Sequence, residues 1–134
     1  MVKLILGLKG SGKTKRLVEL VREAVASENG DVVCIEKEKK LTFDIPYQAR
    51  LIEAGSYSVG SYEFIRGFIC GLHSGNYDIT HVFVDKIVSD RDPQKFTEFL
   101  GWLDAFSAKE NIDFIISATL DPETVGEDVK KYMI

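Results

Sequence analysis

Short apolar runs alternate along this chain with longer segments in which apolar residues recur every three or four positions. Four runs are almost continuously hydrophobic, as expected for strands buried on both faces, and they cover residues 2–6, 32–35, 80–85 and 113–118. Helical periodicity begins at Lys13, after Ser61 and after Asp92, and the last two are expected N-caps. The alternation predicts an α/β protein, a three-layer α/β/α sandwich with a mainly parallel central sheet.

The remaining segments give a weaker pattern. Short strands fit residues 41–44, 50–53 and 132–134. The Asp121-Pro122 pair predicts the start of a last helix that runs to about Lys131. We find no repeat, linker or low-complexity segment, so a single domain is expected over residues 1–134.

The composition is that of an ordinary globular protein and narrows the choice of partners. Of the 134 residues, 45% are hydrophobic and 28% are charged, and the net charge of −4 argues against broad, sequence-independent binding of nucleic acid. No apolar run approaches transmembrane length, and no signal peptide precedes the first predicted strand. Cys34 and Cys70 lie in apolar segments and are expected to be reduced core thiols. These features predict a cytoplasmic location and no membrane span.

The most informative segment is residues 7–14, which read Gly-Leu-Lys-Gly-Ser-Gly-Lys-Thr. They fit the pattern G-x-x-x-x-G-K-[ST] of a phosphate-binding loop, and they stand between a predicted strand and a predicted helix, as that motif requires. We therefore expect a nucleotide-binding site that includes Gly7, Lys9, Gly10, Ser11, Gly12, Lys13, Thr14 and Lys15. Lys9 is in the loop, although an exposed solubilising charge is the simpler interpretation of this residue.

The chemistry of a bound triphosphate explains these residue types. Glycines adopt backbone angles closed to other residues and let the chain approach the phosphate oxygens. Successive N–H groups of residues 10–15, at the positive end of the following helix, are expected to face the β-phosphate. Lys13 would bridge the β- and γ-phosphates, and the Thr14 hydroxyl would ligate Mg²⁺. ATP and Mg²⁺ are therefore the expected cofactors.

A second motif is the predicted strand that ends in Val82-Phe83-Val84-Asp85. An apolar strand ending in Asp is typical of Walker B, whose carboxylate reaches the Mg²⁺ shell, so Thr14 and Asp85 are the expected metal ligands. Many ATPases place a Glu directly after this Asp, but here Lys86 follows. That departure argues against rapid hydrolysis.

These motifs resemble the P-loop NTPase superfamily, and most closely its RecA-like, additional-strand division. The chain is also similar to small bacterial ATP-binding proteins labelled after the twitching-motility ATPase. In that division the strand after the P-loop helix carries the catalytic Glu, so the resemblance implies this role for Glu36, beside Lys13 and Asp85; a solvated strand end is the alternative. It also implies that Ser117, near the end of an additional strand, senses the γ-phosphate, unless its hydroxyl merely caps the strand.

Three functions fit these motifs. The first is an ATP-binding protein with slow or partner-activated, Mg²⁺-dependent hydrolysis. The second is a small-molecule kinase of the nucleoside or nucleotide type, although no clear cluster of arginines indicates a lid. The third is a regulatory module that binds nucleotide without turnover, consistent with Lys86. ATP is expected rather than GTP because no Asn-Lys-x-Asp motif occurs, and a homo-oligomer or a protein partner is compatible with all three.

Overall fold

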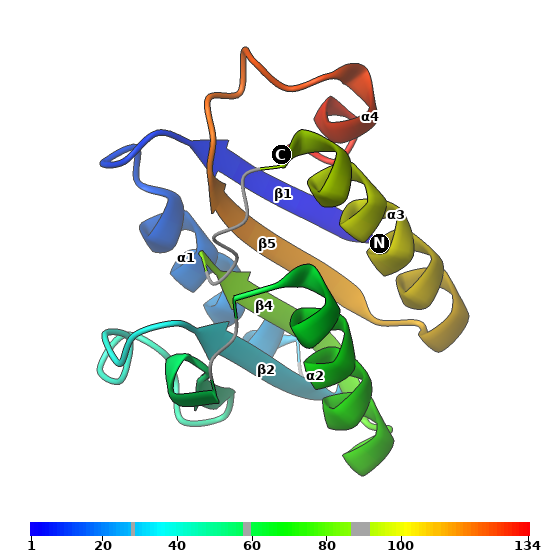
Figure 1. Cartoon of the computed structure of the whole chain (residues 1–134). Helices are drawn as coiled ribbons and strands as arrows, with labels where there is room; N and C mark the ends of the chain where they lie inside the picture. Colours follow the sequence, from blue (N-terminus) through cyan, green and yellow to red (C-terminus); the bar gives the residue numbers. More distant parts are fainter. Residues whose placement is uncertain (28, 58–59, 87–91) are drawn as a thin grey trace.

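The computed structural model describes residues 1–27, 29–57, 60–86 and 92–134. Within them, five strands form one sheet in the order β1-β5-β4-β2-β3, and every neighbouring pair is parallel (Figure 1). The strands are β1 (Val2–Gly7), β2 (Asp31–Glu36), β3 (Arg50–Glu53), β4 (Ile79–Asp85) and β5 (Asp113–Thr119). The predicted α/β class and the parallel sheet are confirmed.

Helices cover both faces of this sheet. One face carries α1 (Lys13–Ala26), whereas α2 (Tyr62–Gly75) and α3 (Pro93–Glu110) lie on the other (Figure 1). The chain also forms a 3₁₀ turn, η1 (Gly55–Tyr57), and a short helix, α4 (Glu127–Lys130), that contacts α3. The predicted caps are present, since the Ser61 side chain accepts a hydrogen bond from the Phe64 N–H and the Asp92 side chain caps α3.

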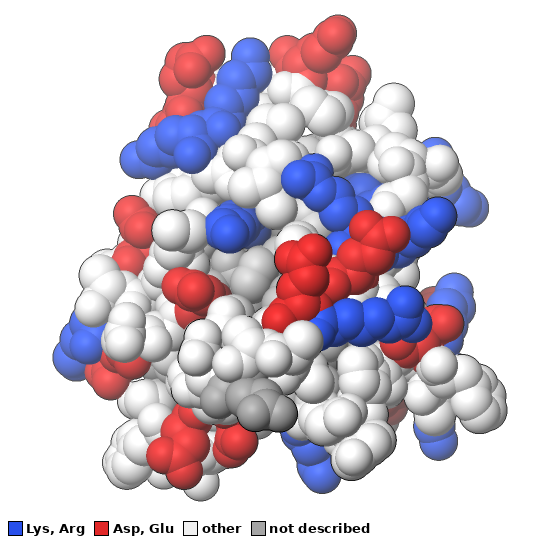
Figure 2. All heavy atoms as spheres, turned by 180° about the vertical axis from the view of Figure 1, so that it is seen from behind, with Lys and Arg blue, Asp and Glu red and all other residues white. Residues whose placement is uncertain are grey.

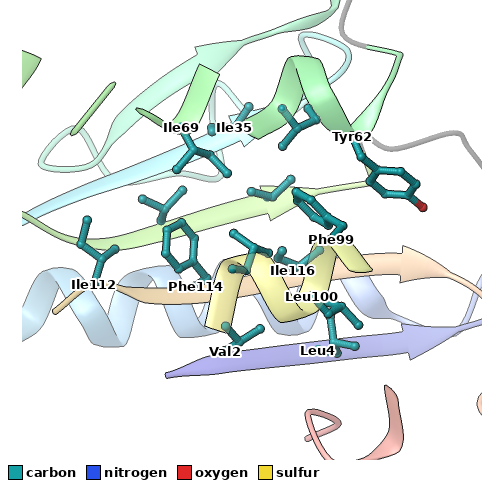
Figure 3. Packing of buried hydrophobic residues seen from close by; sticks show 14 of the residues in the cluster. Val2, Leu4, Ile35, Tyr62, Ile69, Phe99, Leu100, Ile112, Phe114 and Ile116 are labelled. Carbon is teal, nitrogen blue, oxygen red and sulfur yellow. The ribbon is translucent and has the colours of Figure 1, made fainter. Parts of the chain in front are cut away.

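The alternation of side chains along the strands divides the core into two clusters. Val33 and Ile35 of β2 pack toward α2 and α3, together with residues such as Phe114 and Ile116 of β5 (Figure 3). Their neighbours Val32 and Cys34 of β2, Phe83 of β4 and Ile115 of β5 pack toward α1 with Leu17, Val18 and Val21. The two-sided burial explains why the strands are continuously apolar. It also fixes which face any polar residue at a strand end points to.

Three expectations were wrong. Residues 41–44 form a turn, in which the Ile45 N–H donates to the Leu41 carbonyl at 3.0 Å. The last helix does not start at Asp121, because the Asp121 side chain and carbonyl accept hydrogen bonds from residues 123 and 124 and close a turn there. Cys70 is exposed, because it lies on the outer side of α2, whereas Cys34 is buried as expected.

Two other weak patterns have different outcomes. Residues 50–53 are strand β3, as expected. Residues 132–134 run beside β1 but form only an isolated parallel bridge between Leu4 and Met133. In the part of the chain that the structure describes, no helix is long and apolar enough to span a bilayer.

Candidate functional site

The glycine-rich loop joins the end of β1 to the start of α1. Gly10 and Gly12 have φ values of 84° and 85°, in the left-handed region that favours glycine. Gly7 is needed for another reason, because a Cβ atom there would lie 2.2 Å from the Ser11 Oγ. The glycines of the motif thus serve two purposes: two allow the backbone to turn, and one allows the loop to pack against itself.

The first turn of α1 has no side-chain cap among the described residues, because its N-cap is Gly12. The N–H groups of the first turn of a helix lack intrahelical partners and form a favourable site for an anion. Lys13 is the first residue of the helix, and its side chain folds back over the loop, where Nζ donates to the Leu8 carbonyl at 2.9 Å. This lysine is only 5% exposed, which is unusual for an ammonium group.

Three polar side chains lie at the carboxyl ends of neighbouring strands. Glu36 of β2 pairs in register with Asp85 of β4, and Asp85 pairs with Ser117 of β5. Each stands two positions after a residue that packs toward α1, namely Cys34, Phe83 and Ile115. Because side chains alternate along a strand, all three point to the α1 face, where the glycine loop lies. Ligands of parallel α/β sheets gather at this edge.

Asp85 is the centre of a hydrogen-bond network that joins the sheet to α1. Ser117 Oγ donates to Asp85 Oδ1 at 2.6 Å, and Thr14 Oγ1 lies 3.2 and 3.3 Å from the two carboxylate oxygens. Asp85 and Thr14, the two expected Mg²⁺ ligands, are therefore in contact. Ser117, the expected γ-phosphate sensor, instead positions the Asp85 carboxylate in this structure.

Glu36, the expected catalytic carboxylate, is 2% exposed and is bound to the backbone of the following loop. Its Oε1 accepts hydrogen bonds from the N–H groups of Lys40 at 2.7 Å and Leu41 at 3.2 Å. These bonds give the side chain a structural role, because they hold the turn that replaces the strand expected at 41–44. A role for Glu36 in activating water stays a prediction.

The distribution of buried polar side chains singles out this region. Among the described residues, five polar or charged side chains are buried: Lys13, Glu36, Asp85, Ser107 and Ser117. Four of them surround the glycine loop and the strand ends, and only Ser107 lies elsewhere. Burying polar groups costs free energy, and ionisable groups are buried mainly where function needs them.

Burial and the neighbouring charges shift the pKa of Lys13 in opposing directions. Burial lowers the pKa of Lys13 below its ordinary value of 10.5, and the positive charge of Lys86 lowers it further, against the opposing effect of Asp85. Lys86 lies directly after Asp85 and has a φ of 50°, an uncommon value for a residue other than glycine. The two lysine charges therefore oppose each other next to a loop that is shaped for an anion.

A pocket of about 240 Å³ opens between the strand ends and the loop after β2. Its walls are formed by Thr14, Glu36, Lys37, Glu38, Lys40, Leu41, Asp85 and Lys86. The candidate metal ligands and the candidate catalytic Glu36 thus line one cavity. Lys9 and Lys15 do not line it and are exposed to solvent.

The donor set fits Mg²⁺ that arrives with a nucleotide. The described residues contain no cluster of three or more His, Cys, Asp or Glu side chains that is able to hold a metal on its own. Magnesium is usually bound by one or two protein oxygens together with phosphates and water, and Thr14 and Asp85 offer such oxygens side by side.

The backbone conformation of Lys86 is the main feature of the site that the sequence motifs did not predict. The identity of this residue is evident in the sequence, but nothing there indicates a left-handed backbone, which is usually signalled by Gly or Asn.

Comparison of the sequence with protein-family models and with curated proteins found no match. The function of this chain is therefore inferred from the geometry of the site.

Proposed function

We propose that this chain is an ATP-binding protein of the P-loop NTPase superfamily that hydrolyses ATP slowly, or only when a partner activates it, in the presence of Mg²⁺. The observation that carries the proposal is the convergence of three side chains on one glycine loop: buried Lys13, and Thr14 within 3.2 Å of Asp85. The loop amides and Lys13 would bind the phosphates, while Thr14 and Asp85 would hold Mg²⁺, which neutralises charge that develops on the phosphates.

The strand order supports the narrower resemblance to the additional-strand division. Strand β5 lies between β1, which leads into the glycine loop, and β4, which ends in Asp85. Ser117 on that intervening strand is bonded to Asp85, so the polar residue expected there is at least coupled to the metal site. RecA-like sites often borrow an Arg from a neighbouring subunit, so a homo-oligomer or a protein partner belongs to this proposal.

Two features support slow rather than rapid hydrolysis. Lys86 stands where many ATPases have a Glu that activates water. The remaining candidate, Glu36, is occupied by two backbone N–H groups, from Lys40 and Leu41. A general base must reach the attacking water, and the oxygen of Glu36 left for this role is Oε2, which lies 3.4 Å from the Leu41 N–H.

Binding is tested by Lys13→Ala. ATP with Mg²⁺ at about 100 times its Kd should stabilise the native protein by about 2.7 kcal/mol, measured as a rise in melting temperature. We expect Lys13→Ala to lose most of this rise, whereas Lys109→Ala removes the same charge from the exposed end of α3 and should retain it. An equal rise in wild-type protein and Lys13→Ala would refute the assignment of the site.

Turnover is tested by Glu36→Gln. The glutamine oxygen can still accept the Lys40 N–H, so the loop should stay folded and ATP binding should persist. If Glu36 activates water, phosphate release should fall at least about a hundredfold, the size expected for loss of a general base. Equal rates of phosphate release in the two proteins would end the catalytic role of Glu36.

A small-molecule kinase is the second candidate, favoured by one observation. A larger cavity, of about 720 Å³, lies beside the 240 Å³ pocket that Thr14 and Asp85 line, which we call the phosphate-side pocket, and shares Lys86 with it. Nucleotide-dependent phosphate release without an added acceptor supports the ATPase. Transfer of phosphate to an added nucleoside supports the kinase, and tight binding with neither reaction supports a regulatory module. A cytoplasmic location stays a prediction.

A further inference from the structure

The larger cavity lies at the same carboxyl edge of the sheet as the phosphate-side pocket, but on the face that carries α2 and α3. Its volume is about 720 Å³, within the range of small-molecule sites. Three segments form most of its wall: residues 118–120 at the end of β5, 93–98 in the first turns of α3, and 124–129 before and within α4.

The cavity is adjacent to the nucleotide site. Thr119, which lines it, pairs in register with Gly7, the first residue of the glycine loop. Among the described residues, Lys86 is the one that lines both cavities. It follows the last residue of β4, and its left-handed backbone turns the chain at the point where the two cavities meet.

The lining combines an apolar floor with acidic groups. Phe96 and Val129 are 6% and 4% exposed and form apolar parts of the wall. Two carboxylates, Glu98 and Asp128, belong to the same lining, and both residues are exposed to solvent. Apolar side chains favour a ring, whereas carboxylates accept hydrogen bonds from hydroxyl or amino groups and disfavour an anion.

We propose that this cavity binds a second small molecule, an uncharged ring compound with hydroxyl donors, the class to which nucleosides belong. Its ring would pack on Phe96 and Val129, and its hydroxyls would donate to Asp128 or Glu98. The proposal goes beyond the proposed function, on which it rests for the triphosphate in the neighbouring site. Lys86 then links two ligands that lie on opposite faces of the strand end.

The test uses the full chain labelled with ¹⁵N and loaded with Mg²⁺ and a non-hydrolysable ATP analogue. Adenosine, inosine, cytidine and uridine are titrated separately, and amide signals of residues 118–120 and 124–129 are followed. We expect at least one nucleoside to produce saturable shifts centred on these residues. The 2′,3′-dideoxy form of that nucleoside should bind at least fivefold more weakly, because it lacks the donors for Asp128.

Three variants make the test specific. Gln94→Trp places a large side chain at an exposed position of the lining and should weaken nucleoside binding at least tenfold. Lys109→Trp makes a comparable change at the other end of α3 and should leave binding unchanged. In the double variant Glu98→Ala, Asp128→Ala, which lacks both carboxylates of the lining, the advantage of the nucleoside over its dideoxy form should largely disappear.

The proposal is overturned if none of the four nucleosides gives saturable shifts at these residues. It is equally overturned if the shifts map only to residues 10–14, or if Gln94→Trp binds as tightly as wild type. The signals of residues 10–14 on adding the ATP analogue report separately on the proposed function. If the ATP analogue saturates its site but no nucleoside binds, only the proposal of a second site is refuted. If the analogue itself does not bind, the proposed nucleotide site is refuted.

Discussion

Replacing Ser117 by Ala tests whether Asp85 is held in place by β5. Ser117 is 2% exposed, and its hydroxyl donates to Asp85 Oδ1 at 2.6 Å. Ser107 offers a control outside the site, because it is also 2% exposed; its hydroxyl donates at 2.6 Å to the carbonyl of Ile112 and accepts a hydrogen bond from the N-terminal ammonium of Met1. The two variants remove the same atom from equally buried positions, one inside the site and one outside it.

The expected loss of stability follows from the acceptor. A hydrogen bond to a charged group contributes about 1.5–3 kcal/mol, and one to a neutral carbonyl about 0.5–1.5 kcal/mol. Each kcal/mol corresponds to roughly 3–5 °C in melting temperature for a domain of this size. Without nucleotide, Ser117→Ala should therefore melt roughly 5–15 °C below wild type. Ser107→Ala loses bonds to a carbonyl and to the terminal ammonium and should lose a comparable amount of stability.

The effect on ligand binding should separate the two serines more clearly. Without Ser117 Oγ, the longer contacts from Thr14 to the two Asp85 oxygens remain, so the carboxylate should be less well oriented for Mg²⁺. Loss of such a supporting group typically costs tenfold or more in metal affinity. Isothermal titration should show a drop of about tenfold in affinity for ATP with Mg²⁺ in Ser117→Ala, and little change with EDTA present. Ser107→Ala should bind as wild type does.

A double-mutant cycle tests the hydrogen bond between Ser117 and Asp85 directly. The stability losses of Ser117→Ala and Asp85→Ala should not add, because each variant removes the same bond, and the coupling energy should be about 1 kcal/mol or more. Additive losses would refute the contact. Equal effects of Ser117→Ala and Ser107→Ala on Mg²⁺-dependent binding would refute the functional reasoning even if the contact exists.

Two further predictions use pKa directions. Because burial and Lys86 lower the pKa of Lys13, the ammonium that binds phosphate should be lost as pH rises through a value below 10.5, and ATP affinity should fall there. Lys13→Arg should not show this fall in ATP affinity. Lys86→Met should move the pH at which affinity falls to a higher value, while weakening ATP binding overall. If Lys86→Met leaves that pH unchanged in titrations from pH 7 to 10, the role given to Lys86 is contradicted. Burial and the charges of Asp85 and Glu36 raise the pKa of the Cys34 thiol to about 12. Iodoacetamide at pH 8 should therefore label only the exposed Cys70 in native protein, and both thiols in denaturant. Rapid labelling of Cys34 in native protein would be inconsistent with its burial.

The parts of the fold that the sequence predicts are those decided by local pattern. The continuous apolar runs identify four of the five strands, and Ser61 and Asp92 mark where α2 and α3 start. The strand predicted at 41–44 is wrong because a side chain just before it, the Glu36 carboxylate, binds the N–H groups of Lys40 and Leu41 and holds a turn. An apolar pattern carries no information about such a side-chain anchor.

The residues of the site also divide into those that local sequence predicts and those that it does not. The glycine loop and the strand ending in Asp85 are evident from residue types, and their contact through Thr14 follows from the rule that parallel strands present their ends at one edge. The bond from Ser117 to Asp85 requires knowing that β5 lies beside β4, which depends on long-range pairing rather than on local sequence. The left-handed Lys86 and the second cavity likewise arise from tertiary structure.

From the charges around the glycine loop we expect a magnesium nucleotide to suit this site better than either component alone. Glu36 and Asp85 are buried carboxylates on adjacent strands, whereas Lys13 is a buried cation whose pKa is lowered partly by Lys86. A free anion would relieve the lysines but approach the carboxylates, and a free divalent cation would do the reverse. A complex of Mg²⁺ with a triphosphate carries both signs a few ångströms apart, with the metal for Asp85 and the phosphates for Lys13. We therefore expect Mg²⁺ and ATP to bind more tightly together than either does alone.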